Sequence, residues 1–341
     1  MVAVQSGATS ADIQFQSLLQ EYPALATAHH VVRSSRPPQY FKVTNQIFEQ
    51  WVKPLGLDWI PETVIVLNLI VSIDTLFEAC QTSREVQIIA DELSGMTRLN
   101  TAMLYLHTLP ENMEMTLEVS VKIHLAFVTA AGHKKLQVFF GDETADSWLE
   151  IWQRLVRSFN KQQREFSIET LQPESYKSGS SANLSRLVQT YLSQYEKTNG
   201  LSMIIMGMVP FSRVASINLF SALVELTDEL EPLLRLVTDA CVDTSEALNL
   251  GIFIVANEKN VSIAQARQFL VENPREMSLV EDQLRKEQQV YLTKARSVVS
   301  SILKKYSEPT VNTILTEFSQ VLLAVAQKLS EDCKSFHDIE A

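Results

Sequence analysis

The sequence predicts an all-α protein. Glycine is scarce, with 9 residues in 341, and proline is modest at 11. Apolar residues recur at intervals of three and four over long stretches, which is the period of one face of a helix. Short runs with strand-like composition, such as KLQVFF at residues 135–140, stand alone. Isolated runs of this kind do not predict a sheet, so the helical periodicity decides the fold class.

The expected helices follow one another along most of the chain. The windows with helical periodicity are 62–82, 84–106, 146–166, 183–197, 214–230, 232–256, 262–272, 279–304 and 310–333. Proline, glycine and serine mark the expected breaks at Ser34–Pro38, Leu109–Asn112, Pro173–Asn183 and Ser307–Pro309. Composition does not change across these breaks. We therefore expect a flexible N-terminus over residues 1–12 and a single helical domain over residues 13–341.

Composition excludes several functional classes. The net charge is −11 and basic residues are scattered, which argues against a nucleic-acid surface. The longest apolar run, residues 64–73, is too short for a membrane span and Asp74 ends it. Cys80, Cys241 and Cys333 are widely spaced without a CxxC pair, which predicts reduced thiols. With no signal-peptide pattern at the start of the sequence, we expect a cytoplasmic location.

An acidic face follows an apolar one in NLIVSIDTLFEACQ, residues 68–81. Asp74 and Glu78 are one helical turn apart, at the end of the most apolar run of the chain. Most acidic pairs at this spacing are solvated surface residues. Carboxylates on an apolar helix, however, are costly to bury unless they are paired or bind a metal.

A second acidic face occurs in LLRLVTDACVDTSEALNLGIFIV, residues 233–255. Asp239, Asp243 and Glu246 are spaced at i, i+4 and i+7, so a helix places them on one side. Like charges at this spacing are mildly destabilising. The two most apolar helices of the chain thus carry the same unusual feature.

A divalent cation would relieve the repulsion within both acidic faces. Carboxylate oxygens suit Mg²⁺, which commonly bridges protein carboxylates and substrate phosphates. If the two helices face each other across a bundle, their acidic ends hold Mg²⁺ at the mouth of an apolar cavity. This arrangement predicts a substrate with a diphosphate head and a hydrocarbon tail, because the metal neutralises the leaving diphosphate and the dry cavity protects a carbocation.

Three segments, in the order that the family has them, resemble the class I terpene synthases. PETVIVLNLIVSIDTLFEA at residues 61–79 looks like the helix that ends in the DDxxD/E motif, here DTLFE. VQTYLSQYEKTNGL at residues 188–201 is similar to the YLxxRxxTxG helix. The stretch at residues 233–266 looks like the second metal helix, whose family motif is NDxxSxxKE, with the segment that follows it.

The resemblance implies a class I terpenoid synthase-like helical bundle and a lyase activity on a prenyl diphosphate. Such an enzyme uses three Mg²⁺ ions to ionise farnesyl diphosphate, and yields diphosphate and a cyclic hydrocarbon, for which a humulene-type product is one option and the identity stays open. The implied catalytic residues are Asp74, Glu78 and Asp239. The implied metal ligands are Asp74, Glu78, Asp239, Asp243 and Glu246. Monomer and homodimer are both open, as is a C20 substrate.

The sequence departs from the family motifs at several positions. Thr75 replaces the second Asp of the first motif, and Val242 replaces the Ser of the second, so that Asp243 is expected to take its place as ligand. The position of the family's diphosphate-sensing Arg falls at Tyr195 or Glu196. The basic residues that could replace it are Arg186, Lys197, Arg213 and Arg235, of which we select Arg186, Lys197 and Arg235 for the substrate site.

Phe77 and Phe211 are the aromatic candidates for the substrate pocket, because an aromatic face stabilises a cation. Gly207 and Pro210 interrupt an apolar helix beside Phe211, which predicts either a helix end or a helix break in a cavity wall. Two other functions stay open. One is a catalytically inactive terpene-fold or helical scaffold protein, which the missing Arg positions favour. The other is a prenyl-chain transferase, which normally carries denser Asp motifs.

Overall fold

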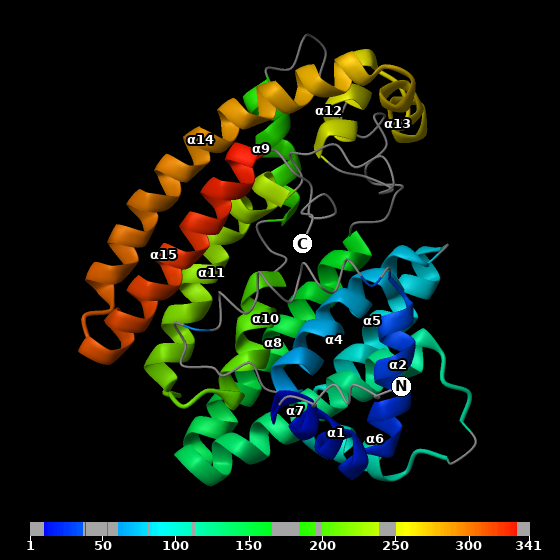
Figure 1. Cartoon of the computed structure of the whole chain (residues 1–341), viewed down its shortest axis with the longest axis vertical. Coiled ribbons are helices and arrows are strands. Elements are labelled where there is room, and N and C mark those ends of the chain that lie inside the picture. The colour runs from blue at the N-terminus through cyan, green and yellow to red at the C-terminus, as the bar shows by residue number, and fades with distance from the viewer. Residues whose placement is uncertain are drawn as a thin grey trace, which may run out of the picture. The chain divides into compact units, whose positions relative to one another are not determined.

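The computed structural model describes residues 10–36, 38, 53, 61–80, 82–110, 113–165, 184–195, 200–238 and 250–332. All regular structure within these ranges is helical and none is strand, which confirms the all-α prediction. The chain divides into two compact units, shown together in Figure 1. Unit 1 comprises Met1–Val156 and Ile204–Ile217, and unit 2 comprises Arg157–Met203 and Asn218–Ala341.

Unit 1 is built around a long central helix, α7. Its helices are α1 (Ser10–Glu21), α2 (Pro23–Ser34), α4 (Pro61–Glu78), α5 (Ser83–Met96), α6 (Leu99–His107), α7 (Leu117–Phe140) and the first part of α8 (Asp142–Glu165). Helices α2, α4, α5 and α6 all contact α7 (Figure 1). The middle of α7 is therefore buried on every side, and residues 123–129 have almost no exposed surface.

The end of α7 contains the isolated run with strand-like composition. Residues 135–140, whose composition is strand-like, form its last two turns. Within them Leu136 is buried, while Val138 and Phe139 are 68% and 70% exposed. The helix that starts at Leu117 propagates through this run because each added residue gains a backbone hydrogen bond. It stops at Gly141, which has a φ of 87° that favours glycine.

Helix α4 matches the predicted window closely, although it ends at Glu78 rather than at residue 82. The next predicted window, 84–106, is two helices, because the chain bends at Thr97 and Arg98. The start of α5 has a local cause. The Thr82 side chain accepts a hydrogen bond from the Glu85 N–H, and the Glu85 carboxylate accepts one from the Thr82 N–H.

Helix α10 (Gly200–Met208) settles the alternative left open at Pro210. It is followed by a 3₁₀ turn, Val209–Phe211, and by a non-helical connection to α11 (Ile217–Thr238). Pro210 therefore marks a helix end. The windows 214–230 and 232–256 are not separated at residue 231, because α11 continues through Pro232. A proline there costs about 3 kcal/mol, which burial of Leu230 and Leu233 on either side offsets.

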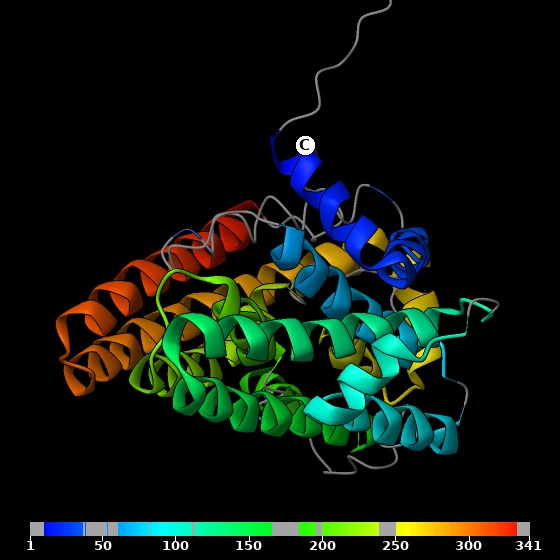
Figure 2. The ribbon, with the colours of Figure 1, turned by 90° about the horizontal axis from the view of Figure 1, so that it is seen from below.

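Unit 2 contains α9 (Leu184–Tyr195), α11, α12 (Leu250–Lys259), α13 (Ile263–Glu272), α14 (Pro274–Lys305) and α15 (Pro309–Asp332). Helices α14 and α15 lie side by side in both Figure 1 and Figure 2. The turn between them is held by Asn312, whose Nδ2 donates to the carbonyls of Leu303 and Tyr306 at 2.6 and 2.9 Å. This confirms the break predicted at Ser307–Pro309.

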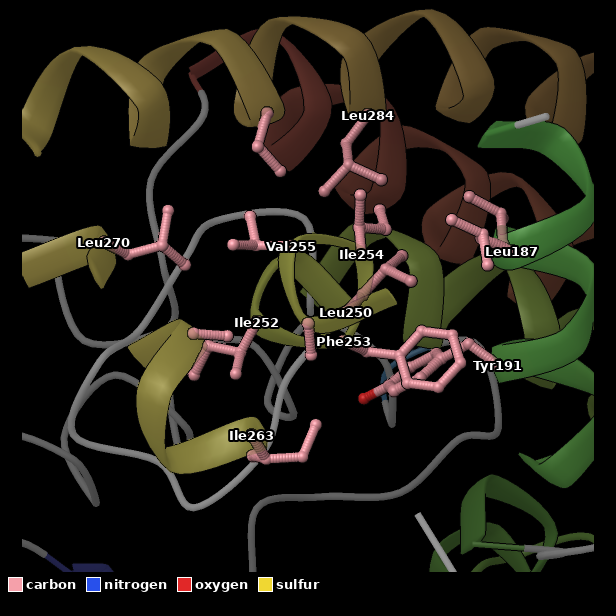
Figure 3. Close-up of a cluster of buried hydrophobic side chains, with 14 of the residues drawn as sticks. Leu187, Tyr191, Leu250, Ile252, Phe253, Ile254, Val255, Ile263, Leu270 and Leu284 are labelled. Atoms are coloured by element: carbon pink, nitrogen blue, oxygen red, sulfur yellow. The ribbon is translucent and has the colours of Figure 1, made fainter. Parts of the chain in front are cut away.

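A second apolar core lies within unit 2 (Figure 3). Helix α12 is buried from Leu250 to Ala256 and packs against α9, α13 and α14. The rings of Tyr191 and Phe253 pack at a tilt of 48° with their centroids 5.5 Å apart, and Leu284 enters the cluster from α14. The apolar residues of the segment 233–255 that lie on α12 are thus part of the core of this unit.

Candidate functional site

The acidic end of α4 is the part of the predicted site that the structure describes best. Asp74 is half-buried in the last part of a helix whose preceding residues are almost fully buried, among them Leu69 and Ile73 at 0% exposure. Glu78 is the final residue of this helix, and its side chain lies outside the described part. Asp74 and Thr75 are thus half-buried between the buried apolar residues Ile73 and Leu76.

A guanidinium lies against this acidic end. Arg36 Nε donates a hydrogen bond of 3.0 Å to Oγ1 of Thr75, next to Asp74 in sequence. The Thr75 hydroxyl in turn donates to the Val71 carbonyl at 2.9 Å. Thr75 is the residue that stands in place of a motif carboxylate. The cationic side chain of Arg36 therefore contacts the position where the motif has its second Asp.

Arg36 was not among the residues predicted from the sequence. It lies 39 residues before Thr75, just beyond the end of α2. The one local signal was the basic pair Arg33 and Arg36 beside the break predicted at Ser34–Pro38, because cations are favoured where a helix ends. Burial lowers the pKa of Arg33 from its ordinary value, although arginine keeps its charge at neutral pH.

A second bond shows how α2 lies along α4. Asn68 Nδ2 donates to Nδ1 of His29 at 3.1 Å, again across 39 residues. From this pair to the Arg36–Thr75 pair, both segments advance by seven residues, which is about two helical turns. The two segments therefore run parallel here, with polar contacts at both ends of the shared length.

The second predicted acidic face lies outside the described residues. Helix α11 ends at Thr238 and α12 begins at Leu250, and Asp239, Asp243 and Glu246 fall between them. Lys197 also lies outside the described part. Within the described ranges, no group of three or more His, Cys, Asp or Glu residues could hold a metal. Since four of the five predicted ligands are not described there, the Mg²⁺ site stays a prediction.

The other predicted head-group residues have differing surroundings. Arg186 is exposed on α9. Arg235 is half-buried on α11, with its Nε 3.5 Å from Oε1 of Glu231. Glu231 is only 4% exposed and accepts a 2.7 Å hydrogen bond from the Leu201 N–H at the start of α10. This ion pair thus stabilises the α10 N-terminus within unit 2.

Phe77 and Phe211 are both buried. A residue that lines an apolar pocket and a residue of the core are both buried, so burial does not separate these two roles. Lys135 Nζ lies 5.5 Å from the centroid of the Phe211 ring, within the range of a cation–π contact. The Phe211 ring therefore already faces a cation that belongs to the protein.

No protein-family model matches this chain, and no curated protein or solved structure is significantly similar to it. The likeness to class I terpene synthases therefore stays a prediction from the motifs. Among the described helices, none combines the length and the apolar character that crossing a bilayer requires.

Proposed function

We propose that this protein is a Mg²⁺-dependent lyase that acts on a prenyl diphosphate, with farnesyl diphosphate as the first candidate substrate. The observation that supports it most is Asp74, a half-buried carboxylate at the end of a helix buried for most of its length. Arg36 adds a cationic group at the same turn. A carboxylate beside a guanidinium could hold a metal–diphosphate head group above an apolar wall.

Carboxylate oxygens are the ligand type that Mg²⁺ prefers, so Asp74 fits that role together with Glu78 and the second acidic stretch. When bound, Mg²⁺ would supply positive charge to the leaving diphosphate. In the proposed reaction the allylic C–O bond breaks and diphosphate leaves with the electron pair. The cation closes a ring and loses a proton to the diphosphate, which gives a hydrocarbon without a protein base.

The test is incubation of the purified protein with farnesyl diphosphate, with Mg²⁺ or with a chelator, and detection of hydrocarbons in the headspace. We expect a cyclic product only with Mg²⁺. We expect Asp74→Asn to lower kcat by about 100-fold, the loss typical of removing one transition-state charge contact, while helicity is retained. Asp91→Asn, which neutralises an exposed carboxylate on α5, is the matched control and should leave kcat unchanged.

A second candidate is a helical protein without catalytic activity. The hydrogen bond from Arg36 to Thr75 favours it, because a guanidinium there provides positive charge at the acidic end without a metal. Absence of product with farnesyl, geranyl and geranylgeranyl diphosphates would reject the lyase and favour this candidate. A product that forms equally well in the chelator would reject the Mg²⁺ mechanism.

A further inference from the structure

Three polar side chains meet inside unit 1, where α2, α4 and α7 contact one another. They are His29 on α2, Asn68 on α4 and His124 on α7, and we call them the His–Asn–His cluster. Asn68 and His124 have no exposed surface, and His29 is half-buried. The two imidazole rings are stacked with centroids 6.2 Å apart and planes at 23°.

The hydrogen bonds of the cluster define which ring nitrogens carry protons. His124 Nδ1 is 2.8 Å from the Ser120 carbonyl, which can only accept, so Nδ1 carries the hydrogen and Nε2 a lone pair. His29 Nδ1 accepts from the Asn68 amide, so its hydrogen lies on Nε2. Burial lowers the pKa of His29 to about 3 and that of His124 to about 4, and both rings are neutral at pH 7.

Two acceptor atoms of the cluster stay unpaired. In the part of the chain that the structure describes, no protein group donates a hydrogen bond to Oδ1 of Asn68 or to Nε2 of His124. The nearby hydroxyls of Ser72 and Ser120 donate within their own helices, to the carbonyls of Leu69 and Thr116. Buried acceptors are rarely left unpaired, because their loss of water is then uncompensated.

We propose that the His–Asn–His cluster is an internal binding site for a small neutral hydrogen-bond donor, namely water, which donates to Asn68 Oδ1 and His124 Nε2. Water supplies two polar hydrogens, the kind of group that both atoms lack, and buried waters typically bind such unsatisfied groups. The site joins three helices through their polar atoms. It is independent of the proposed prenyl diphosphate chemistry.

The surroundings favour a neutral occupant over a metal ion. The positive charge of Arg33 disfavours a further positive charge at His29. The lone pair on His29 Nδ1 is already engaged by Asn68, which leaves one nitrogen and one oxygen unpaired in the cluster. Transition-metal sites normally have three or four protein ligands.

The test is ¹⁵N NMR of the full-length protein with labelled histidine, with His124→Gln to assign the resonance. We expect the unprotonated Nε2 of His124 to resonate at the position of a nitrogen that accepts a hydrogen bond, with a water cross-peak to nearby protons. His133, whose Nε2 donates to the Asp146 carboxylate at 3.0 Å, provides the reference for a protonated nitrogen.

Two outcomes would overturn the proposal. An Nε2 resonance at the position of a free lone pair, without a water cross-peak, would mean that the acceptors are dry. Addition of one equivalent of Co²⁺ tests whether a metal ion, rather than a neutral donor, occupies the cluster. Visible d–d absorption that disappears in His124→Gln would show a metal site, whereas an unchanged His124 resonance supports the neutral donor.

Discussion

Asn68, Ser72 and Thr75 lie on one side of α4, and each pairs its polar atoms in a different way. Within the described residues, Ser72 bonds to its own helix, at the Leu69 carbonyl. Thr75 bonds both to its own helix and to Arg36, while Asn68 reaches His29 on α2. Each of the three side chains thus makes at least one hydrogen bond, which lowers the cost of burying it on an otherwise apolar helix, while Asn68 Oδ1 keeps the unpaired position described above.

At the same scale, His124 should make the protein sensitive to mild acid. Its pKa is about 4 in the fold and 6.5 when unfolded, so protons bind the unfolded chain more strongly. The contribution of neutral His124 to the free energy of unfolding is fully present above pH 6.5, and it is lost as the pH drops toward 4. From this residue alone we expect a loss of roughly 2 kcal/mol between pH 7 and pH 5, measured by urea unfolding.

Replacing His124 by Gln should remove this part of the pH dependence and leave the similar part that His29 contributes, because the pKa of His29 is lowered to about 3. His107→Gln, at an exposed position on α6, should leave both parts unchanged. The range is informative because the carboxyls whose pKa is lowered, Glu118 and Glu225, lose their contributions only below pH 4.5. Equal slopes for the original protein and His124→Gln would contradict the expectation.

A second prediction for single residues concerns the hydrogen bond from Arg36 to Thr75. Arg36→Gln and Thr75→Val should each destabilise unit 1, and the double variant should lose less than the sum of both. We expect a coupling free energy of about 1 kcal/mol, typical of a partly buried hydrogen bond. Strictly additive losses in urea unfolding would show that the bond contributes nothing.

At the scale of elements, two glycines permit the close packing of helices in unit 1. A Cβ on Gly207 of α10 would lie 2.9 Å from a methyl carbon of Val66 on α4. A Cβ on Gly132 of α7 would lie 2.9 Å from the indole of Trp148. The indoles also bond across helices, since Trp148 Nε1 donates to the Met206 carbonyl at 2.7 Å and Trp152 Nε1 to Thr129 Oγ1 at 3.0 Å.

We therefore expect Gly207→Ala to destabilise the protein by about 1–3 kcal/mol, because the added methyl group overpacks the core. Gly95→Ala is the matched control on α5, where a Cβ meets nothing within 4 Å. There alanine should stabilise by up to about 1 kcal/mol, since glycine is a poor helix former. Thermal unfolding measures both, and shifts of the same sign would refute the packing argument.

At the scale of the whole molecule, the chain has two compact units while the sequence predicts a single domain. Helix α8 runs without interruption from Asp142–Val156, which belong to unit 1, into residues of unit 2. A continuous helix that starts in one unit and ends in the other should couple their unfolding, because fraying at one end weakens the next turn. We expect one cooperative transition in calorimetry.

Two conservative core variants test this coupling. Ile123→Val on α7 and Ile254→Val on α12 remove one methylene from fully buried sites in unit 1 and unit 2. Each should lower the same transition by about 2 °C. Two separate transitions, each moved by only one variant, would show that the units unfold independently.

Much of the helical structure could be predicted because its causes are local. The windows at 262–272 and 310–333 correspond to α13 and α15 within a residue or two. Helix α7 was missed because it is buried on nearly all sides, so its apolar residues show no single face. Its last turns look like a strand by composition, yet they continue a helix that started 18 residues earlier.

The sequence by itself determined the all-helical class, most helix positions and the acidic end of α4, because periodicity, capping and turn residues act over a few neighbouring positions. Only the tertiary structure decided that Arg36 meets Thr75 and that His29, Asn68 and His124 gather in one core. These contacts join residues 39 or more positions apart. Many alternative pairings satisfy the same local pattern, and only the packing of whole helices selects among them.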